Sequence, residues 1–197
     1  MPACWSATAN LLECHDRRSL RQAVEQYERA IELDPGFDKA HYELLGARAG
    51  LREPERSVAL YERRLAAAPA DVREQRFMAA AYLSAGQYDE ARSVIDAGLE
   101  LAPEDPTLIE LRGDVRSHVG DPDGALADWR RAHALEPKNL SSIYSSAFLF
   151  EREGRLDDAI DAWRYILDWC ESRGYQLDTE WPKRELERLR GAASPSA

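Results

Sequence analysis

Apolar side chains in this chain recur at intervals of three and four residues, within short segments that end at proline, glycine or polar residues. This spacing places apolar residues on one face of a helix and indicates many short amphipathic helices. Four of the interruptions are Pro35, Pro69, Pro103 and Pro137, each 34 residues after the one before. No segment alternates between apolar and polar residues over a strand's length, so the pattern predicts an all-α chain without a sheet.

Three further columns of the sequence follow the same period. Twelve residues before each proline, and at the matching place near the C-terminus, the residue is small: Ala23, Ser57, Ala91, Ala125 and Ala159. Four residues later the residue is large: Tyr27, Tyr61, Ile95, Trp129 and Trp163. A glycine column holds Gly86, Gly120 and Gly154. Together the columns predict a helix, a tight turn at the glycine, a second helix and a stop at the proline.

This register divides most of the chain into five blocks of two antiparallel helices each. The blocks are 4–37, 38–71, 72–105, 106–139 and 140–173. The last block has Glu171 in place of proline, so its second helix is predicted to continue toward Gly174. Residues 178–190 break the repeat and predict a capping helix, and residues 191–197 are predicted to form a disordered tail.

The capping helix carries three apolar residues that could cover the open end of the last block. They are Trp181, Leu186 and Leu189, and Trp169 is their expected contact.

Polar residues mark the starts of several predicted helices. Asp71, Asp105 and Asn139 share one column at the expected N-cap, and Asp121 precedes a proline at the first helical position. Ser19 is predicted to cap the helix that follows it, with Gln22 reaching back in a capping box.

The pattern resembles the tetratricopeptide repeat family, whose motif is a 34-residue helix–turn–helix with an A-x3-F signature and a late proline. The resemblance covers residues 4–173, and its matches are Ala23 with Tyr27, Ala125 with Trp129, Ala159 with Trp163, Tyr82, Phe150 and Gly113. The departures are Leu11 and Cys14 in the first block and Ser57 and Arg64 in the second. The resemblance implies a right-handed superhelical α-solenoid of antiparallel helix pairs.

In this family the first helices line a concave groove that receives an extended peptide or a partner's helix. Carried over, the groove residues are Lys39, Tyr42, Gly46, Arg73, Arg76, Ala80, Leu83, Glu110, Asp114, His118, Tyr144, Phe148 and Arg152. One hypothesis is that Arg73 and Arg76 bind a carboxylate while Tyr144 and Phe148 bind an apolar side chain. The alternative is that these are surface residues whose charges pair within the chain.

One subtype of the family binds the C-terminal tails of chaperones through a clamp of lysine, asparagine and arginine. The corresponding positions here hold Thr8, Leu12, Glu43, Arg73 and Phe77. Only Arg73 suits a carboxylate and Glu43 would repel it, which argues against chaperone tails as partners.

Composition narrows the classes of partner. The net charge of −10, from 26 basic and 36 acidic residues, argues against nucleic acid. No stretch approaches the roughly 20 apolar residues of a membrane span, and the first residues lack the features of a secretion signal. Three cysteines without a CxxC pair favour a reducing compartment, so we expect a cytoplasmic protein.

No group of residues in the sequence has the helix geometry or the spacing that a catalytic or metal site requires. Asp114, Ser117 and His118 lie within about one turn of a single helix, which cannot align a Ser–His–Asp triad. His133 falls in an apolar column and is predicted to be half-buried with its hydrogen bonds satisfied. Cys4, Cys14 and His15 do not have the spacing of a zinc site. We therefore expect no enzyme activity, no metal and no cofactor.

The predicted function is a protein–protein interaction module, an adaptor or scaffold that holds a peptide or helix in its groove. Two alternatives stay open: a homo-oligomeric scaffold joined through a weakened first block (Trp5, Leu11, Leu12), or a regulatory part of a larger enzyme.

Overall fold

The computed structural model describes residues 17–172 and 179–193, and these contain ten helices and no strand. Their bounds are α2 (Arg17–Leu33), α3 (Asp38–Gly50), α4 (Pro54–Ala67), α5 (Val72–Ser84), α6 (Tyr88–Leu101), α7 (Pro106–His118), α8 (Pro122–Leu135), α9 (Ser141–Arg152), α10 (Leu156–Ser172) and α11 (Glu180–Ala193). The first helix predicted for block 4–37 lies outside the described residues, as do Trp5, Leu11, Leu12, Cys4, Cys14 and His15.

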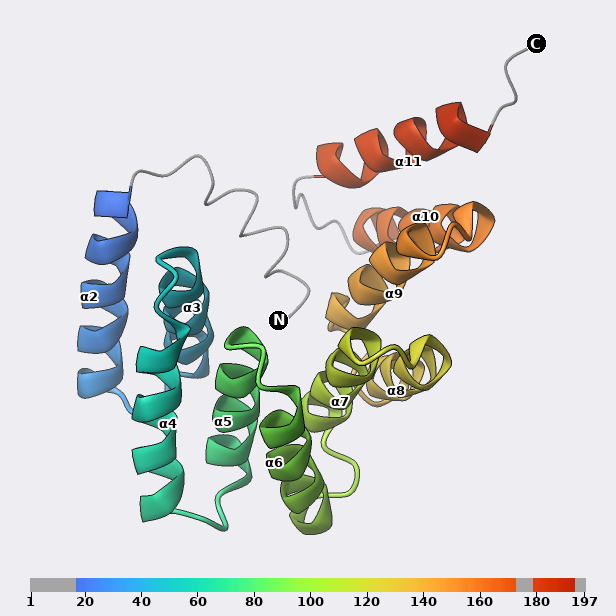
Figure 1. Ribbon diagram of the computed structural model, residues 1–197. Coiled ribbons are helices and arrows are strands. Elements are labelled where there is room, and N and C mark those ends of the chain that lie inside the picture. The colour runs from blue at the N-terminus through green and yellow to red at the C-terminus, as the bar shows by residue number, and fades with distance from the viewer. Residues whose placement is uncertain (1–16, 173–178, 194–197) are drawn as a thin grey trace.

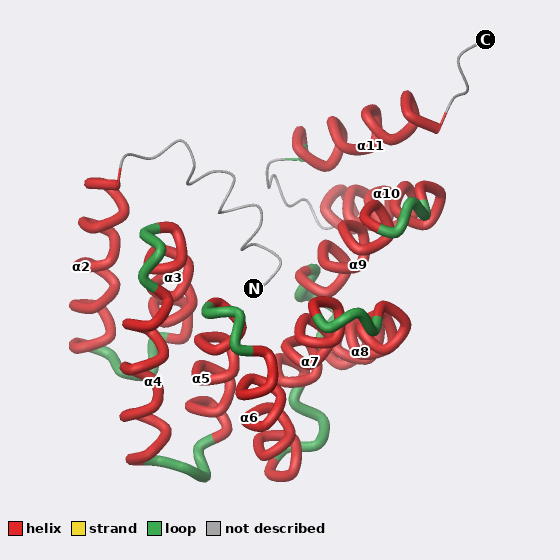
Figure 2. The backbone as a smooth tube through the Cα atoms, viewed as in Figure 1, coloured by secondary structure: helices red, strands yellow, loops and turns green. Residues whose placement is uncertain are grey.

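The helices follow each other along an arc, and sequence neighbours pack side by side (Figure 1). The second helices α4, α6, α8 and α10 begin at residues 54, 88, 122 and 156, a constant step of 34. The odd-numbered helices α3, α5, α7 and α9 lie on the inner side of the arc, and short loops connect the elements (Figure 2). The predicted all-α solenoid of helix pairs is confirmed.

The small and large columns form the contacts between helices. Ser57, Ala91, Ala125 and Ala159 are fully buried, and the large residues Tyr61, Ile95, Trp129 and Trp163 are at most 2% exposed. A Cβ atom added at Gly113 of α7 would lie 2.6 Å from the Trp129 indole nitrogen and 3.2 Å from the Ala125 carbonyl oxygen of α8. The small residues at these positions therefore let the first and the second helix of a pair approach closely.

The glycine column ends the first helix of each pair. Gly86, Gly120 and Gly154 all have a positive φ, between 72° and 86°. Arg52 occupies the same column one repeat earlier and has a φ of 63°. The left-handed conformation is thus imposed by the repeat, even where the residue has a Cβ atom and adopts it at a cost.

Carboxylates cap several helices as predicted. Asp71 accepts a hydrogen bond from the backbone N–H of Arg73, Asp105 from that of Leu108, and Asp121 from that of Gly124. The predicted capping box at Ser19 is wrong, because α2 is already helical at Arg17.

The C-terminal end of the arc is covered by α11. Leu186 and Leu189 are buried in one cluster with α10 residues, and Trp181 packs edge-on to Trp163 with ring centroids 4.9 Å apart. As predicted, α10 is longer than α4, α6 and α8, at 17 residues against 14; Gly174 itself is outside the described residues.

The predicted tail 191–197 is wrong in its first part, since α11 continues to Ala193. The reason is local: two alanines, the best helix formers, follow Gly191. Residues 194–197 lie outside the described part of the chain.

The left-handed turn at Arg52 yields a test of backbone strain. Arg52→Gly should raise the free energy of unfolding by about 0.5–1 kcal/mol, because glycine adopts this φ without a Cβ clash. The reciprocal control, Gly86→Ala, should lower it by about 1 kcal/mol, although the new Cβ would have no atom within 4 Å. Urea denaturation measures both values. Equal stability of Arg52→Gly and the wild type would contradict the assignment of backbone strain to Arg52.

The helix contact at Ala125 yields a second test. Ala125→Leu should overpack the α7–α8 contact and lower the free energy of unfolding by ~1–3 kcal/mol. Ala127→Leu, on the exposed face of the same helix, serves as the matched control and should change stability little. A melting temperature unchanged by Ala125→Leu would show that the helix register is wrong.

Candidate functional site

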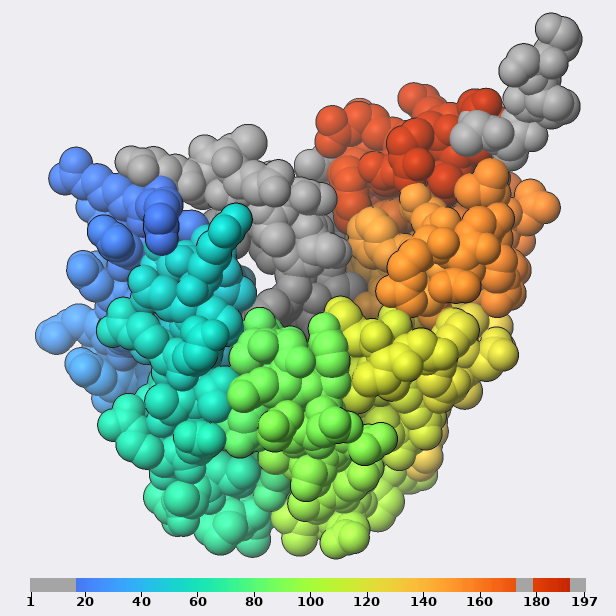
Figure 3. Space-filling model, viewed as in Figure 1, coloured from blue at the N-terminus to red at the C-terminus, as the bar shows by residue number. Residues whose placement is uncertain are grey.

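The inner side of the arc contains a cavity of about 420 Å³ that draws residues from all four inner helices. Figure 3 shows the arc that encloses this side, from the blue α2 to the red α11. The lining residues are Tyr42, Ala80, Leu83, Ser84, Leu111, Asp114, Ser117, His118, Trp129, Ser145, Phe148, Leu149 and Arg152. Because the cavity bridges α3, α5, α7 and α9, its shape depends on the curvature of the repeat array.

Seven of the predicted groove residues line this cavity: Tyr42, Ala80, Leu83, Asp114, His118, Phe148 and Arg152. Six predicted residues do not line it: Lys39, Gly46, Arg73, Arg76, Glu110 and Tyr144. The sequence reasoning missed Ser84, Leu111, Ser117, Trp129, Ser145 and Leu149. Most of these are sequence neighbours of predicted positions, whereas Trp129 belongs to a second helix and reaches the cavity through its size.

The two arginines proposed to bind a carboxylate are already engaged. Arg73 forms an ion pair with Asp38 at 3.3 Å. Arg76 donates from Nε to both carboxylate oxygens of Asp105, at 3.1 and 2.9 Å, and its Nη2 also contacts this carboxylate. Lys39 is exposed away from the cavity lining. The positive charge expected at the centre of the groove is therefore largely neutralised by this chain's own acids.

The predicted aromatic patch is shared between the groove and the core. Tyr144 packs on Trp163 and stacks on Trp181, with ring centroids 5.6 Å apart in both pairs. Phe148 lines the cavity and also contacts Trp163 at 5.5 Å. Of the two residues, Phe148 is thus the one available to a ligand in this cavity.

Five carboxylates in the described part of the chain are less than a tenth exposed, and three of them are paired with arginine. Arg64 binds Glu74 through two hydrogen bonds of 2.9 and 2.6 Å. Arg76 binds Asp105, and Arg112 and Arg116 together bind Asp128. Each of these three pairs links two helices or caps one.

The other two buried carboxylates, Glu110 and Asp114, have no ion pair with any described residue. They are one turn apart on α7 and are 1% and 9% exposed. Asp114 accepts a 3.0 Å hydrogen bond from the Trp129 indole N–H, and Glu110 accepts one of 3.4 Å from Asn139. The Glu110 Oε1 atom is buried without a partner among the described residues.

The surroundings of this pair favour the protonated form of both groups. Burial, and then the Glu110 carboxylate, raise the pKa of Asp114 well above its ordinary value, although the Trp129 hydrogen bond acts in the opposite direction. Burial also raises the pKa of Glu110, against hydrogen bonds from Ser141 and Asn139. The inner face of α7 therefore carries two carboxyl groups that no cation of the described residues compensates.

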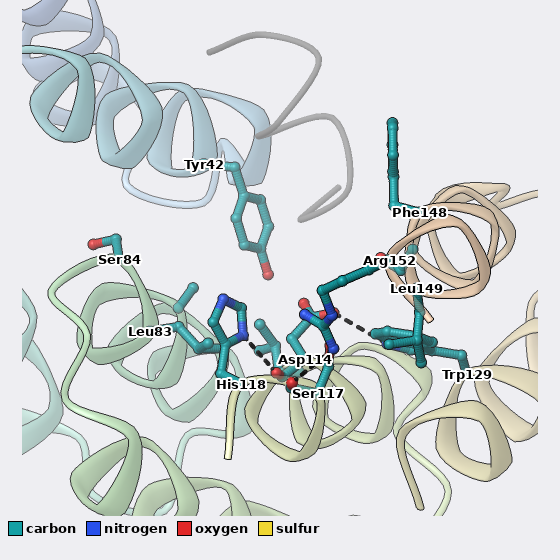
Figure 4. A pocket seen from close by; sticks show the side chains of 13 residues that line it. Tyr42, Leu83, Ser84, Asp114, Ser117, His118, Trp129, Phe148, Leu149 and Arg152 are labelled. Carbon is teal, nitrogen blue, oxygen red and sulfur yellow. Dashed lines mark hydrogen bonds between the residues drawn. The ribbon is translucent and has the colours of Figure 1, made fainter. Parts of the chain in front are cut away.

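The remaining cavity wall is mostly apolar. Figure 4 shows Tyr42 reaching from α3 toward the α7 side chains, with Leu83 on one side and Leu149 on the other. Arg152 enters from α9 and donates to the Ser117 carbonyl and hydroxyl oxygens, at 3.1 and 3.3 Å (Figure 4). The cavity thus combines apolar walls with the Asp114 carboxyl, the His118 imidazole and, at its edge, the Arg152 guanidinium.

The hydrogen bonds of Asp114, Ser117 and His118 differ from those of a Ser–His–Asp triad. The His118 Nδ1 atom is 2.8 Å from the backbone oxygen of Asp114, and the Asp114 carboxylate binds Trp129 instead. His133 is half-buried with both ring nitrogens hydrogen-bonded, to the Asn139 carbonyl oxygen and the Tyr165 hydroxyl, as predicted.

Two kinds of site are absent from the described residues. No group of three histidine, cysteine, aspartate or glutamate residues there could hold a metal ion. No helix in the described ranges is long and apolar enough to cross a membrane.

Comparison with known proteins gives concordant results. Models of the tetratricopeptide repeat match residues 16–72 and 72–115, about half of the chain together. The crystal structure of a thermophilic TPR protein from Thermus thermophilus has a TM-score of 0.67 and 22% identity, over 86% of this chain and 90% of that one. A tetratricopeptide repeat protein from Parabacteroides merdae has a TM-score of 0.56 and 15% identity, over 87% of this chain and 67% of that one.

A curated relative is a tetratricopeptide repeat and J domain-containing co-chaperone, DNJ1, from Fusarium oxysporum f. sp. lycopersici. It is 30% identical over 71% of this chain, and the match spans only 28% of the co-chaperone. The similarity is therefore confined to one part of a longer protein.

The buried carboxyl pair yields a prediction for stability against pH. Both groups hold their protons more tightly in the folded chain, so the free energy of unfolding falls as the pH rises from their ordinary pKa toward the raised value. Asp114→Asn removes one ionisable group and keeps an acceptor for Trp129. This variant should therefore be more stable than the wild type near pH 7.5, by roughly 1–2 kcal/mol, and close to it near pH 3.5.

Urea denaturation at the two pH values measures the difference. Glu100→Gln, at an exposed carboxylate of α6, is the control and should behave like the wild type at both. An Asp114→Asn variant no more stable than the wild type at either pH would contradict the prediction.

Proposed function

Because the chain belongs to the tetratricopeptide repeat family, we propose that it is an adaptor or scaffold that binds an extended peptide or a helix of another protein in its concave groove. The family's fold supports a role in protein–protein interaction in general. The groove on the inner helices is the proposed binding surface.

One observation carries this proposal: the inner helices leave an open cavity of about 420 Å³ with mainly apolar walls. The volume and lining match those of pockets that accept side chains or small ligands. Peptide segments bind such surfaces through a few anchors, and the surrounding polar residues set orientation. The proposed partner is a protein rather than a nucleic acid because the net charge is −10.

A second candidate function is self-association into a structural scaffold. Leu33, Leu101 and Leu135 are the last residues of α2, α6 and α8, and they are 77%, 51% and 40% exposed. They occupy one column of the repeat, which also holds Ala67 and Trp169. Such a row of exposed leucines could contact another copy of the chain.

The remaining features of the proposal follow from the sequence and the relatives. A third candidate is a regulatory part of a larger enzyme; the match to 28% of the co-chaperone's length shows that similar repeats occur as one part of a longer protein. By itself the chain is proposed to be non-catalytic, without cofactor, and cytoplasmic. Chaperone C-terminal tails are not the proposed ligand, because Glu43 stands where a clamp would need a neutral or basic residue.

A site-specific photo-crosslinker tests the binding surface. p-Benzoylphenylalanine would replace Ser84, which lines the cavity, or Leu101, which is exposed on α6, in the cells that express the protein. The proposal expects irradiation to join a partner peptide to position 84 and not to position 101, with the peptide identified by mass spectrometry.

Two other outcomes would change the conclusion. Crosslinks from position 101 to another copy of this chain, with none from position 84, would favour the self-associating scaffold. Crosslinks to a different protein from position 101 alone would place the interface outside the groove and overturn the proposal.

A further inference from the structure

We infer that the groove binds a partner segment through a lysine or arginine side chain, which enters the cavity and places its cationic group against Asp114, with Glu110 one turn away on α7. This inference rests on the proposed function, since it names the anchor by which the partner is held. It also assigns a positive charge to the ligand, whereas Arg73 and Arg76 in the sequence predicted an acidic ligand.

The first argument compares the buried acids of this chain with one another. Glu74, Asp105 and Asp128 each have an arginine partner, at distances of 2.6–2.9 Å for Glu74 and Asp128. A buried carboxylate without a cation is costly, so acids that lack one in the described structure are suited to receive one from a ligand. Among the five buried acids of the described residues, Glu110 and Asp114 fit this description.

The second argument is positional. Asp114 lines the cavity, and the Trp129 indole N–H holds its Oδ1 atom, which fixes the orientation of the carboxylate. Glu110 lies one turn earlier on α7, with a buried Oε1 atom that has no hydrogen bond to any described residue. The Asp114 carboxyl can accept from the several N–H donors of an ammonium or guanidinium group, and the Glu110 carboxyl, which does not line the cavity, is close enough to favour a positive charge there.

The third argument comes from the cavity walls. A lysine or arginine side chain has a long apolar stem, and Leu83, Leu111 and Leu149 offer it apolar contacts. The rings of Tyr42 and Phe148 also line the cavity, and aromatic rings attract cations through their faces. The apolar walls thus suit the stem of such a side chain, and the Asp114 carboxyl suits its cationic group.

One basic residue at the edge of the cavity acts against a cationic ligand. Arg152 lies there, with its side chain exposed, its Nε atom 3.6 Å from Glu153 and its Nη2 bonded to Ser117. Its charge is thus solvated and partly compensated, whereas the carboxyl groups of Glu110 and Asp114 are buried. Removing it should therefore strengthen the binding of a cation.

The test uses the full chain and three small probes that differ in one group. Nα-acetyl-lysine amide carries the cation, Nα-acetyl-norleucine amide has a similar stem without charge, and Nα-acetyl-glutamate amide carries an anion. The readout is the ¹H–¹⁵N resonance of the Trp129 indole, assigned with a Trp129→Phe variant, because this N–H donates to Asp114.

We expect the lysine probe to shift this resonance in a saturable way and to bind at least tenfold more tightly than the norleucine probe. Asp114→Asn and Glu110→Gln should each weaken the binding of the lysine probe severalfold or more, whereas Glu100→Gln should leave this binding unchanged. Arg152→Gln should tighten the binding of the lysine probe. Glu110→Gln keeps the Trp129–Asp114 hydrogen bond, so its effect on the binding of the lysine probe tests the inference even if Asp114→Asn disturbs the fold.

Equal binding of the lysine and norleucine probes, or tighter binding of the glutamate probe, would overturn the inference. So would lysine binding that Asp114→Asn and Glu110→Gln both leave intact. These probes report on the cavity alone and the crosslinks at position 84 report on a partner, so failure of the inference and failure of the proposed function are separately visible.

Discussion

The structure depends on one repeated contact, in which a small residue of each second helix lets the neighbouring helix approach. Ser57, Ala91, Ala125 and Ala159 are fully buried at this contact. One turn further on, Tyr61, Ile95, Trp129 and Trp163 fill the space that the small residues leave beside them. A larger residue in the small column would separate the helices of a pair, and a change at one pair would alter the curvature felt by all the following pairs.

The same contact explains why the inner helices carry the candidate site. The second helices bury one face and expose the other to solvent, but α5, α7 and α9 pack on both neighbouring pairs and keep an inward face as well. On α7 that third face holds Asp114, with Glu110 one turn before it, whereas its other faces hold buried residues such as Leu108 and Val115. Neighbouring helices desolvate these two carboxyl groups and give them hydrogen bonds, but no described residue of those helices forms an ion pair with them.

Much of the fold could be predicted because its determinants are local and periodic. The prolines, the glycines with positive φ and the N-cap aspartates act within a few residues of themselves. The candidate site was harder, because its charges are set by distant partners: Arg76 meets Asp105 across 29 residues. Tyr144 is likewise drawn to Trp181 of the last helix. Asp114 could be placed on the groove from the repeat register, but its lack of a cation among the described residues is visible only when the neighbouring helices are in place.

The packing of α11 has a consequence for how arrays of this kind can grow. Trp181 rests against Tyr144 and Trp163, and Arg188 contacts Glu151, so α11 occupies the surface on which a sixth helix pair would stack. End-to-end joining of two copies through this terminus would require α11 to leave. The contacts of Trp181 with Tyr144 and Trp163 thus compete with those that a further repeat would make at this end of the described array.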